Sequence, residues 1–251
     1  MSLPSLRESI SALLGLVFRS RCEVCRADSD EALCAECASG FDEPPERICA
    51  ICGLPMKERS RFLNCFHCNR HKPAFKRLRS LWLYDGALQK AITLIKFPRP
   101  RVRRRELADA LMAVIEQRLT TRGNPLPGFK KGDENALVLP SPMHAKRLRQ
   151  RGISLAAEFA RVVSDAWEVP LREDLLVKDR QTAPQVRLAR EERLLNVKDS
   201  FRLLSPGEID GKICLVVDDV ATTCATLNEC ARTLKLAGAE RVYGLTIARQ
   251  P

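Results

Sequence analysis

Apolar and polar positions alternate with two different periods in the part of this 251-residue chain that follows residue 76. Short apolar runs there are typical of buried strands, and the longer stretches between them repeat with the period of a helix. The expected strands cover residues 81–84, 136–140, 175–178, 212–217 and 241–248. The expected helices cover residues 87–96, 106–119, 155–167 and 226–237. This alternation predicts an α/β domain with a parallel sheet flanked by helices, whose ligands bind beyond the carboxyl ends of the strands.

Two further segments precede this domain. Apolar residues between Leu6 and Val17 recur at helical spacing, so we expect an amphipathic helix within residues 1–19. Its apolar stretch is interrupted by Ser11 and is much shorter than the roughly 20 residues of a membrane span, and no signal-peptide cleavage site follows it. We therefore expect a cytoplasmic protein with no membrane span, composed of this helix, a cysteine-rich segment at 20–75 and the α/β domain at 76–251.

Cysteines are concentrated in the middle segment. Eight of the eleven form four CxxC pairs, namely Cys22/Cys25, Cys34/Cys37, Cys49/Cys52 and Cys65/Cys68. A CxxC pair directs two sulfurs toward one point, so two pairs make a tetrahedral thiolate site for zinc. Disulfides, redox chemistry or an iron–sulfur cluster are the alternatives, but disulfides need an oxidising compartment.

The short gaps between the pairs favour sequential pairing, with the first four cysteines on one zinc and the last four on a second. An interleaved arrangement is also compatible with the spacing. His67 and His71 lie close by in the sequence, but the cysteines already complete both ligand sets. Because four protein ligands leave no position for water, both zinc ions are expected to be structural.

The net charge of +11 is unevenly distributed. Residues 76–151 contain 18 Lys and Arg against 6 Asp and Glu, so this stretch alone accounts for the excess. Clustered cations favour a polyanionic partner because binding releases condensed counterions. We expect single-stranded DNA to be that partner, and the candidate contacts are Arg101, Arg103, Arg104 and Arg105. The alternative is a solvated basic face without a ligand.

The segment KICLVVDDVATTCATL, residues 212–227, carries the strongest candidate chemistry. Its apolar strand ends in Asp218 and Asp219, and a threonine-rich turn leads directly into a helix. Two carboxylates can accept hydrogen bonds from a vicinal diol, and amides at a helix N-terminus can bind a phosphate. A diol beside a phosphate describes a ribose 5-phosphate. The alternatives are a Mg²⁺ site or a simple helix cap.

Three separated motifs resemble known sequences. VVDDVATTCAT resembles the phosphoribosyl pyrophosphate motif of type I phosphoribosyltransferases, and together with LPSPMHAKRLRQRGIS, RQTAPQVRLAREERLLNV and the four CxxC pairs it resembles the ComF family. The resemblance implies a double zinc ribbon followed by a type I phosphoribosyltransferase-like domain. It also implies a cytoplasmic role in DNA uptake, either for transformation or for the use of DNA as a nutrient.

The resemblance also implies functional residues. Asp218 and Asp219 would hold the ribose hydroxyls and would be the catalytic acids. The residues around the 5-phosphate would be Ala221, Thr222, Thr223, Cys224, Ala225 and Thr226. His144, Arg147 and Arg151 would lie near the pyrophosphate of a Mg²⁺ complex. The segment 180–196 would form a hood, with Arg180, Gln185, Arg190 and Arg193 as its contacts. Cys224 stands where this superfamily most often has glycine.

Several functions agree with these features. The first is a phosphoribosyl-pyrophosphate-binding protein with transferase chemistry that acts during DNA uptake and binds single-stranded DNA. The second is a non-catalytic nucleic-acid-binding protein or sensor that keeps the sugar-phosphate site, and the third is a nucleotide-salvage transferase. A DNA-uptake helicase or another competence protein is a possible protein partner under the first hypothesis.

Overall fold

A computed structural model describes residues 20–97, 102–179 and 199–251 of the protein. The helix expected within residues 1–19 lies outside the described residues, and so do Arg101 and the four expected contacts of the hood, Arg180, Gln185, Arg190 and Arg193. Among the described residues, no helix combines the length and the apolar character that a membrane crossing requires.

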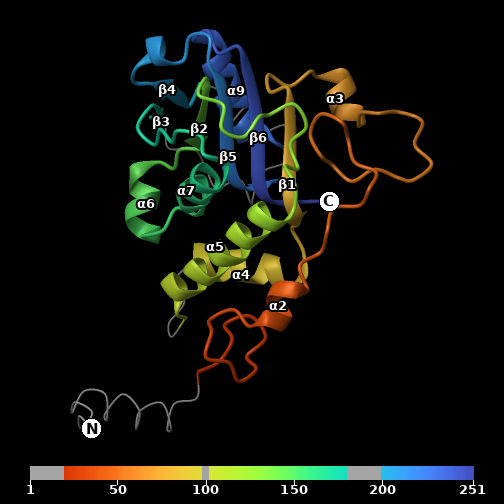
Figure 1. The fold of residues 1–251 in the computed structure, drawn as a ribbon, viewed down its shortest axis with the longest axis vertical. Coiled ribbons are helices and arrows are strands. Elements are labelled where there is room, and N and C mark those ends of the chain that lie inside the picture. The colour runs from red at the N-terminus through yellow and green to blue at the C-terminus, as the bar shows by residue number, and fades with distance from the viewer. Residues whose placement is uncertain (1–19, 98–101, 180–198) are drawn as a thin grey trace.

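The centre of the fold is a four-stranded parallel sheet with the order β1-β6-β5-β2. Its strands are β1 (Arg77–Leu83), β2 (Ala136–Pro140), β5 (Ile213–Ala221) and β6 (Arg241–Arg249). Strand β5 lies between β2 and β6 and is paired on both sides (Figure 1). This arrangement confirms the parallel sheet expected from the alternating pattern.

Helices cover both faces of the sheet because β5 directs alternate apolar residues to opposite sides. Leu215 and Val217 share one apolar core with α4 (Gly86–Lys96), α5 (Arg104–Thr121) and α7 (Leu155–Trp167). Cys214 and Val216 share the other core with α9 (Ala225–Leu236). Both cores are built from residues that are almost fully buried.

One expected strand belongs elsewhere. Residues 175–178 were expected in the parallel sheet, but β3 (Leu176–Lys178) pairs antiparallel with β4 (Phe201–Leu203) in a separate two-stranded sheet. Residues 180–196 therefore fall between β3 and β4, and not between two strands of the central sheet as expected. A short apolar run indicates a strand but does not determine which strand it pairs with.

The cysteine-rich segment forms two modules. The first module, residues 20–43, contains α2 (Ala35–Ser39) and packs on the α4/α5 side, where the rings of Phe41 and Trp82 lie 5.3 Å apart. The second module, residues 47–75, contains α3 (Phe66–Arg70) and lies against β1, whose Leu78 amide donates to the Ile51 carbonyl at 2.7 Å. Each module thus extends a different one of the two cores.

Three details of the α/β domain bear on the site. Strand β5 continues to Ala221, four residues beyond the expected end at residue 217. The short helix α6 (Ala145–Arg151) follows β2 and was not expected from the pattern. The 3₁₀ turn η2 (Pro206–Glu208) precedes β5.

Candidate functional site

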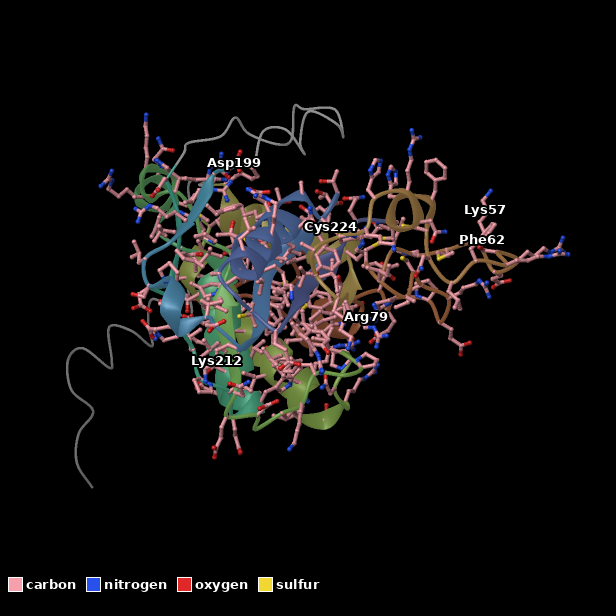
Figure 2. All side chains as sticks on the ribbon, turned by 90° about the horizontal axis from the view of Figure 1, so that it is seen from above. Lys57, Phe62, Arg79, Asp199, Lys212 and Cys224 are labelled. Atoms are coloured by element: carbon pink, nitrogen blue, oxygen red, sulfur yellow. The ribbon has the colours of Figure 1, made fainter. Side chains whose placement is uncertain are left out.

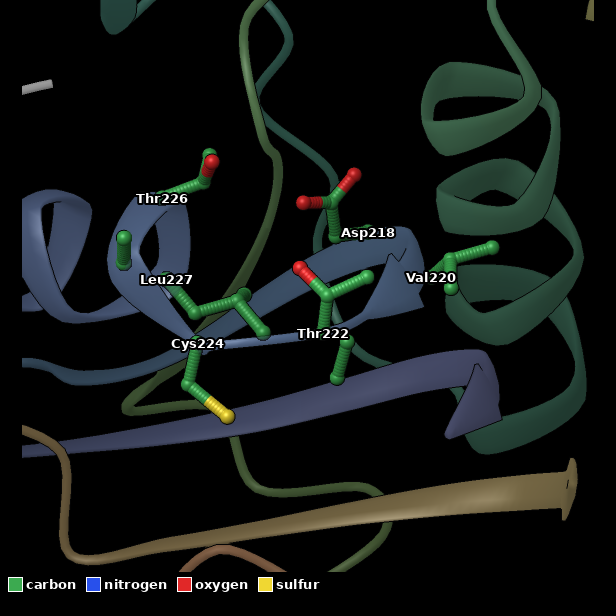
Figure 3. A pocket seen from close by; sticks show the side chains of 8 residues that line it. Asp218, Val220, Thr222, Cys224, Thr226 and Leu227 are labelled. Carbon is green, nitrogen blue, oxygen red and sulfur yellow. The ribbon is translucent and has the colours of Figure 1, made fainter. Parts of the chain in front are cut away.

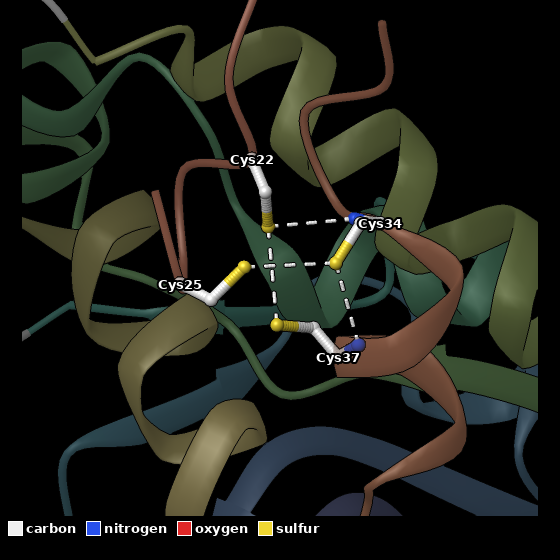
Figure 4. Close-up of side chains that lie close together, drawn as sticks. All are labelled: Cys22, Cys25, Cys34 and Cys37. Atoms are coloured by element: carbon white, nitrogen blue, oxygen red, sulfur yellow. Dashed lines mark hydrogen bonds between the residues drawn. The ribbon is translucent and has the colours of Figure 1, made fainter. Parts of the chain in front are cut away.

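Each module brings four cysteine sulfurs together. Cys22, Cys25, Cys34 and Cys37 form one group, which Figure 4 shows. The second group is formed by Cys49, Cys52, Cys65 and Cys68, and all Sγ atoms of a group lie within 4.8 Å of one another. This is the sequential pairing that the spacing favours, and the interleaved alternative does not occur. His67 and His71 belong to neither group.

The sulfur distances fit zinc and not disulfides. Cys22 Sγ lies 3.9 Å from Cys37 Sγ, and Cys25 Sγ lies 3.7 Å from Cys34 Sγ. Four sulfurs at about 2.3 Å from a tetrahedral zinc would be about 3.8 Å apart, whereas a disulfide needs about 2 Å. All eleven cysteines are free thiols in this structure. The two groups therefore fit two structural zinc ions with four thiolate ligands each.

The two aspartates at the end of β5 have different surroundings. Because β5 continues through them, their side chains lie on opposite faces of the sheet. Asp218 faces the α9 side and lines an open hollow of about 210 Å³. The Asp219 carboxylate instead forms an ion pair with Lys96 at the end of α4, with 2.8 Å between Nζ and Oδ1.

Asp218 lies in an environment that disfavours its charge. Burial raises the pKa of this carboxyl to about 6, and the neighbouring charge of Asp219 contributes to the increase. Hydrogen bonds from the Ser141 side chain and from the Asp219 amide, the latter 2.9 Å long, oppose the shift but do not cancel it. A half-buried carboxylate with a raised pKa beside a hollow is typical of a functional group.

The turn between β5 and α9 has the geometry of an anion site. Cys224 adopts a left-handed conformation with φ of 63°, and α9 begins at the next residue. The first turn of α9 contains no acidic residue, and the N-terminal N–H groups of a helix attract anions. The hollow at this N-terminus is lined by Asp218, Val220, Ala221, Thr222, Cys224, Ala225, Thr226 and Leu227.

Figure 3 shows how these side chains divide between two sides of the turn. The carboxylate of Asp218 and the hydroxyls of Thr222 and Thr226 lie on one side, whereas the sulfur of Cys224 points to the other side. Thr223 does not line the first hollow. Its Oγ1 accepts a hydrogen bond of 3.3 Å from the Ala225 amide, and it lines a second hollow together with Cys224.

The residues expected near a pyrophosphate lie on α6 and just before it. His144 precedes α6, and its Nδ1 accepts a hydrogen bond of 3.2 Å from the Lys146 amide, so this ring caps the helix. The charge of Arg147 acts on Arg151, whose own pKa is lowered chiefly by burial. The negative charge of Asp219 acts in the opposite direction and raises the pKa of Arg151. The two arginines therefore place positive charge beside the end of β5.

Lys178 in β3 is a cation near Asp218 that the sequence analysis did not identify. Burial lowers the pKa of Lys178, and the charge of Arg147 lowers it further, while Asp218 opposes the shift. The residue belongs to a short apolar run, and nothing in that run indicates that β3 reaches the end of β5. Lys178 lies there because β3 pairs with β4, and β4 packs against α9.

The described arginines of the expected DNA contact are engaged within the protein. Arg103 forms ion pairs with Glu23 and Glu106, and Arg105 pairs with Asp109 and Glu158. The guanidinium of Arg104 donates to the carbonyls of residues 95 and 151. The positive charge of this cluster is therefore partly neutralised or is directed inward.

A second basic surface lies before the basic stretch at residues 76–151 and was not predicted. Residues 57–72, which we call the finger segment, contain five Lys and Arg residues and one acid, Glu58. Phe62 and Phe66 in this segment are each 69% exposed, and Leu63 is 79% exposed. Figure 2 shows Lys57 and Phe62 at the outer end of a loop that projects from the molecule.

Two family models and several known proteins match this chain. A model described as a phosphoribosyl transferase domain matches residues 148–251, and one described as a double zinc ribbon domain matches residues 13–70. The chain is 30% identical over 239 residues to DNA utilization protein YhgH of Salmonella typhi, covering 91% of this chain and 96% of that protein. It is 25% identical over 236 residues to competence protein F of Haemophilus influenzae, covering 92% and 98%. A solved glutamine phosphoribosylpyrophosphate amidotransferase from B. subtilis is 17% identical, with a TM-score of 0.39 over 62% of this chain and 30% of that chain.

The opposite environments of the two aspartates predict opposite effects on stability. Because the native pKa of Asp218 is raised, the folded protein keeps a proton that the unfolded chain releases between about pH 4 and 6. This group therefore stabilises the fold less as pH rises through that window. Asp218→Asn should raise the free energy of unfolding at pH 8 by about 1–3 kcal/mol, with an advantage that shrinks toward pH 4.

Asp219→Asn should lower the free energy of unfolding by about 1–3 kcal/mol, because it leaves the partly buried Lys96 ammonium without its carboxylate. Urea denaturation of both variants and the parent protein, compared at equal pH with zinc present, measures these values. Equal destabilisation by the two substitutions would contradict the assignment.

Proposed function

This chain belongs to the ComF family, which includes competence protein F and DNA utilization protein YhgH, and from that membership we propose that it binds Mg²⁺–phosphoribosyl pyrophosphate and single-stranded DNA. It is a phosphoribosyltransferase-like protein of competence and DNA utilisation. The observation that supports the ligand is the hollow at the start of α9, where a carboxylate and a helix N-terminus meet.

In this proposal the sugar phosphate spans the turn. The 5-phosphate accepts hydrogen bonds from the main-chain amides at the beginning of α9, supported by the hydroxyls of Thr222 and Thr226. Asp218 accepts hydrogen bonds from the ribose hydroxyls at the other end of the same hollow. A bound phosphate is negatively charged, so the positive end of the α9 dipole stabilises it further.

Positive charge beside the carboxyl end of β5 suits the pyrophosphate. Arg147 and Arg151 on α6 and Lys178 on β3 all interact electrostatically with the aspartates or with one another. When Mg²⁺ is bound with the ligand, it neutralises part of the charge on the pyrophosphate. Phosphoribosyl transfer needs mainly a fixed ribose, a neutralised leaving group and the exclusion of water, and these cations would supply the second requirement.

Asp219 takes a different role in the proposal. Its carboxylate is already paired with Lys96, and the two side chains are only 16% and 19% exposed. We therefore assign Asp219 to holding the end of α4 against β5, which keeps the carboxyl end of this strand in position. Asp218 alone then contacts the sugar.

Isothermal titration calorimetry with Mg²⁺–phosphoribosyl pyrophosphate tests this assignment. Asp218→Asn should weaken binding by about 10–100-fold, because one or two charge-assisted hydrogen bonds are lost. Asp109→Asn, which changes an exposed carboxylate on α5, is the matched control and should bind as the parent protein does. If Asp218→Asn bound the ligand with unchanged affinity, the ribose would not be bound in this hollow.

Single-stranded DNA is the second ligand, and the finger segment supports it better than the arginines at the start of α5. Exposed aromatic rings provide faces on which bases stack, and flexible cations follow the phosphate backbone. The finger segment presents Phe62 and Phe66 among basic residues, whereas Arg103 and Arg105 already have carboxylate partners. We therefore place the DNA contact on the second module.

Binding of a labelled oligothymidylate at several salt concentrations separates the two surfaces. Replacing Arg59 and Arg61 with Ala should reduce the slope of log affinity against log salt by about 1.4, at about 0.7 for each lost phosphate contact. Phe62→Ala should weaken binding by about 5–150-fold through lost stacking.

The control for this experiment is the double variant Arg103→Ala/Arg105→Ala. It should leave the slope of log affinity against log salt unchanged. If this pair flattened the slope and the finger variants did not, the DNA contact would lie on α5 instead. Absence of any salt-dependent binding in the parent protein would reject the DNA ligand altogether.

A further inference from the structure

We infer that the cysteine group of the second module is part of the anion site, because Arg249 and Cys224 connect its zinc–thiolate centre to the turn formed by residues 221–226. Zinc in this group, but not in the first, would hold the turn in its anion-binding shape. The inference rests on the proposed function in treating the turn as a phosphate site, but the connection itself is testable without a ligand.

Arg249 at the end of β6 is a buried cation that contacts the turn. The residue is 1% exposed, and its Nη1 donates to the carbonyls of Ala221, at 2.6 Å, and Thr222. Its Nε is buried and has no hydrogen-bond partner among the described residues. A buried guanidinium needs a nearby negative charge to offset the loss of hydration.

The second cysteine group supplies that charge. Four thiolates outweigh the two charges of a zinc ion, so the occupied centre remains negative. Arg249 lines one hollow together with Cys52, a member of this cysteine group. The guanidinium therefore lies between an anionic metal centre on one side and the two carbonyls of the turn on the other.

Cys224 makes a second connection. Its side chain packs against the core that contains Cys52 and the other cysteines of the second group. In Figure 3 the Cys224 sulfur points away from Asp218, and the second hollow, of about 580 Å³, is lined by Cys224, Arg249 and Cys52. A left-handed non-glycine residue is strained, and it persists where surrounding contacts hold it. The packing of Cys224 against this core is such a restraint.

The second module is itself attached firmly to the sheet, so the connection joins two fixed parts. The Arg79 side chain donates to the Ala50 carbonyl at 3.0 Å. At Gly53, which has a φ of 65°, a Cβ atom would lie 3.1 Å from the Leu78 carbonyl oxygen, so this turn approaches β1 closely. The first cysteine group instead belongs to the opposite core, together with α4 and α5.

The test uses the full, zinc-loaded chain and measures zinc loss from each group separately. A chelator is added, released thiols are alkylated, and the modified cysteines are mapped by mass spectrometry. Arg249→Met should weaken zinc retention at the second group by about 10–100-fold, as expected when a group that supports metal ligands is removed. Zinc retention at the first group should not change. Arg249→Lys should restore part of the retention because it keeps the charge.

Two further variants control for a general loss of structure. Cys224→Gly removes the thiol and introduces a residue that adopts the left-handed conformation without strain, so it should also speed zinc loss at the second group while the protein stays folded. Arg103→Met removes a guanidinium that donates to the Arg21 carbonyl beside the first group, and it should not affect the second group.

Hydrogen exchange of the amides at 221–226 supplies the second measurement. Loss of zinc from the second group should accelerate their exchange at least about tenfold, whereas disruption of the first group by Cys22→Ser should not. The inference would be overturned if Arg249→Met and Cys224→Gly retained zinc as the parent protein does. It would also be overturned if the amides at 221–226 exchanged at the same rate after zinc loss. Because neither measurement involves phosphoribosyl pyrophosphate, a failure of that ligand to bind would be recognised separately.

Discussion

The pairing of β5 with parallel strands on both sides is the constraint on which the site depends. Val217 lies in register with Pro140 of β2 and with Leu245 of β6, and both faces of β5 are buried at this point. A shift of one residue would exchange the two faces, so the register is strongly specified. Asp218 consequently always emerges on the side where α9 begins, and Asp219 on the side of α4.

The same sheet explains why the cysteine modules are not independent appendages. Each is too small to have an adequate core of its own, and four thiolates around a metal can replace that core. The cores on either side of the sheet then continue into the modules, one into each. The edge strand β1 is contacted by both modules, through Leu78 for the second and through Leu83, whose amide donates to the Asp42 carbonyl, for the first. Metal binding and sheet formation are in this way connected.

Local sequence information was sufficient where local forces decide the structure. Strand β2 and helix α7 have the expected bounds, and the cysteine spacing led to the correct two groups. Local sequence information was insufficient where the position or partner of a residue is determined by a segment far along the chain. The pairing of Asp219 with Lys96 joins residues 123 positions apart, and no local pattern indicates it. The pairing of β3 with β4 likewise depends on a strand on the far side of residues 180–198.

The site as a whole rests on Asp218 and the start of α9 acting together on one ligand, and a crystal structure of the zinc-loaded chain with Mg²⁺ and phosphoribosyl pyrophosphate tests this most directly. We expect the 5-phosphate at the amides of residues 222–226 and the ribose hydroxyls on the Asp218 carboxylate. A ligand bound away from this turn, or a ribose held by Asp219 with its Lys96 pair broken, would contradict it.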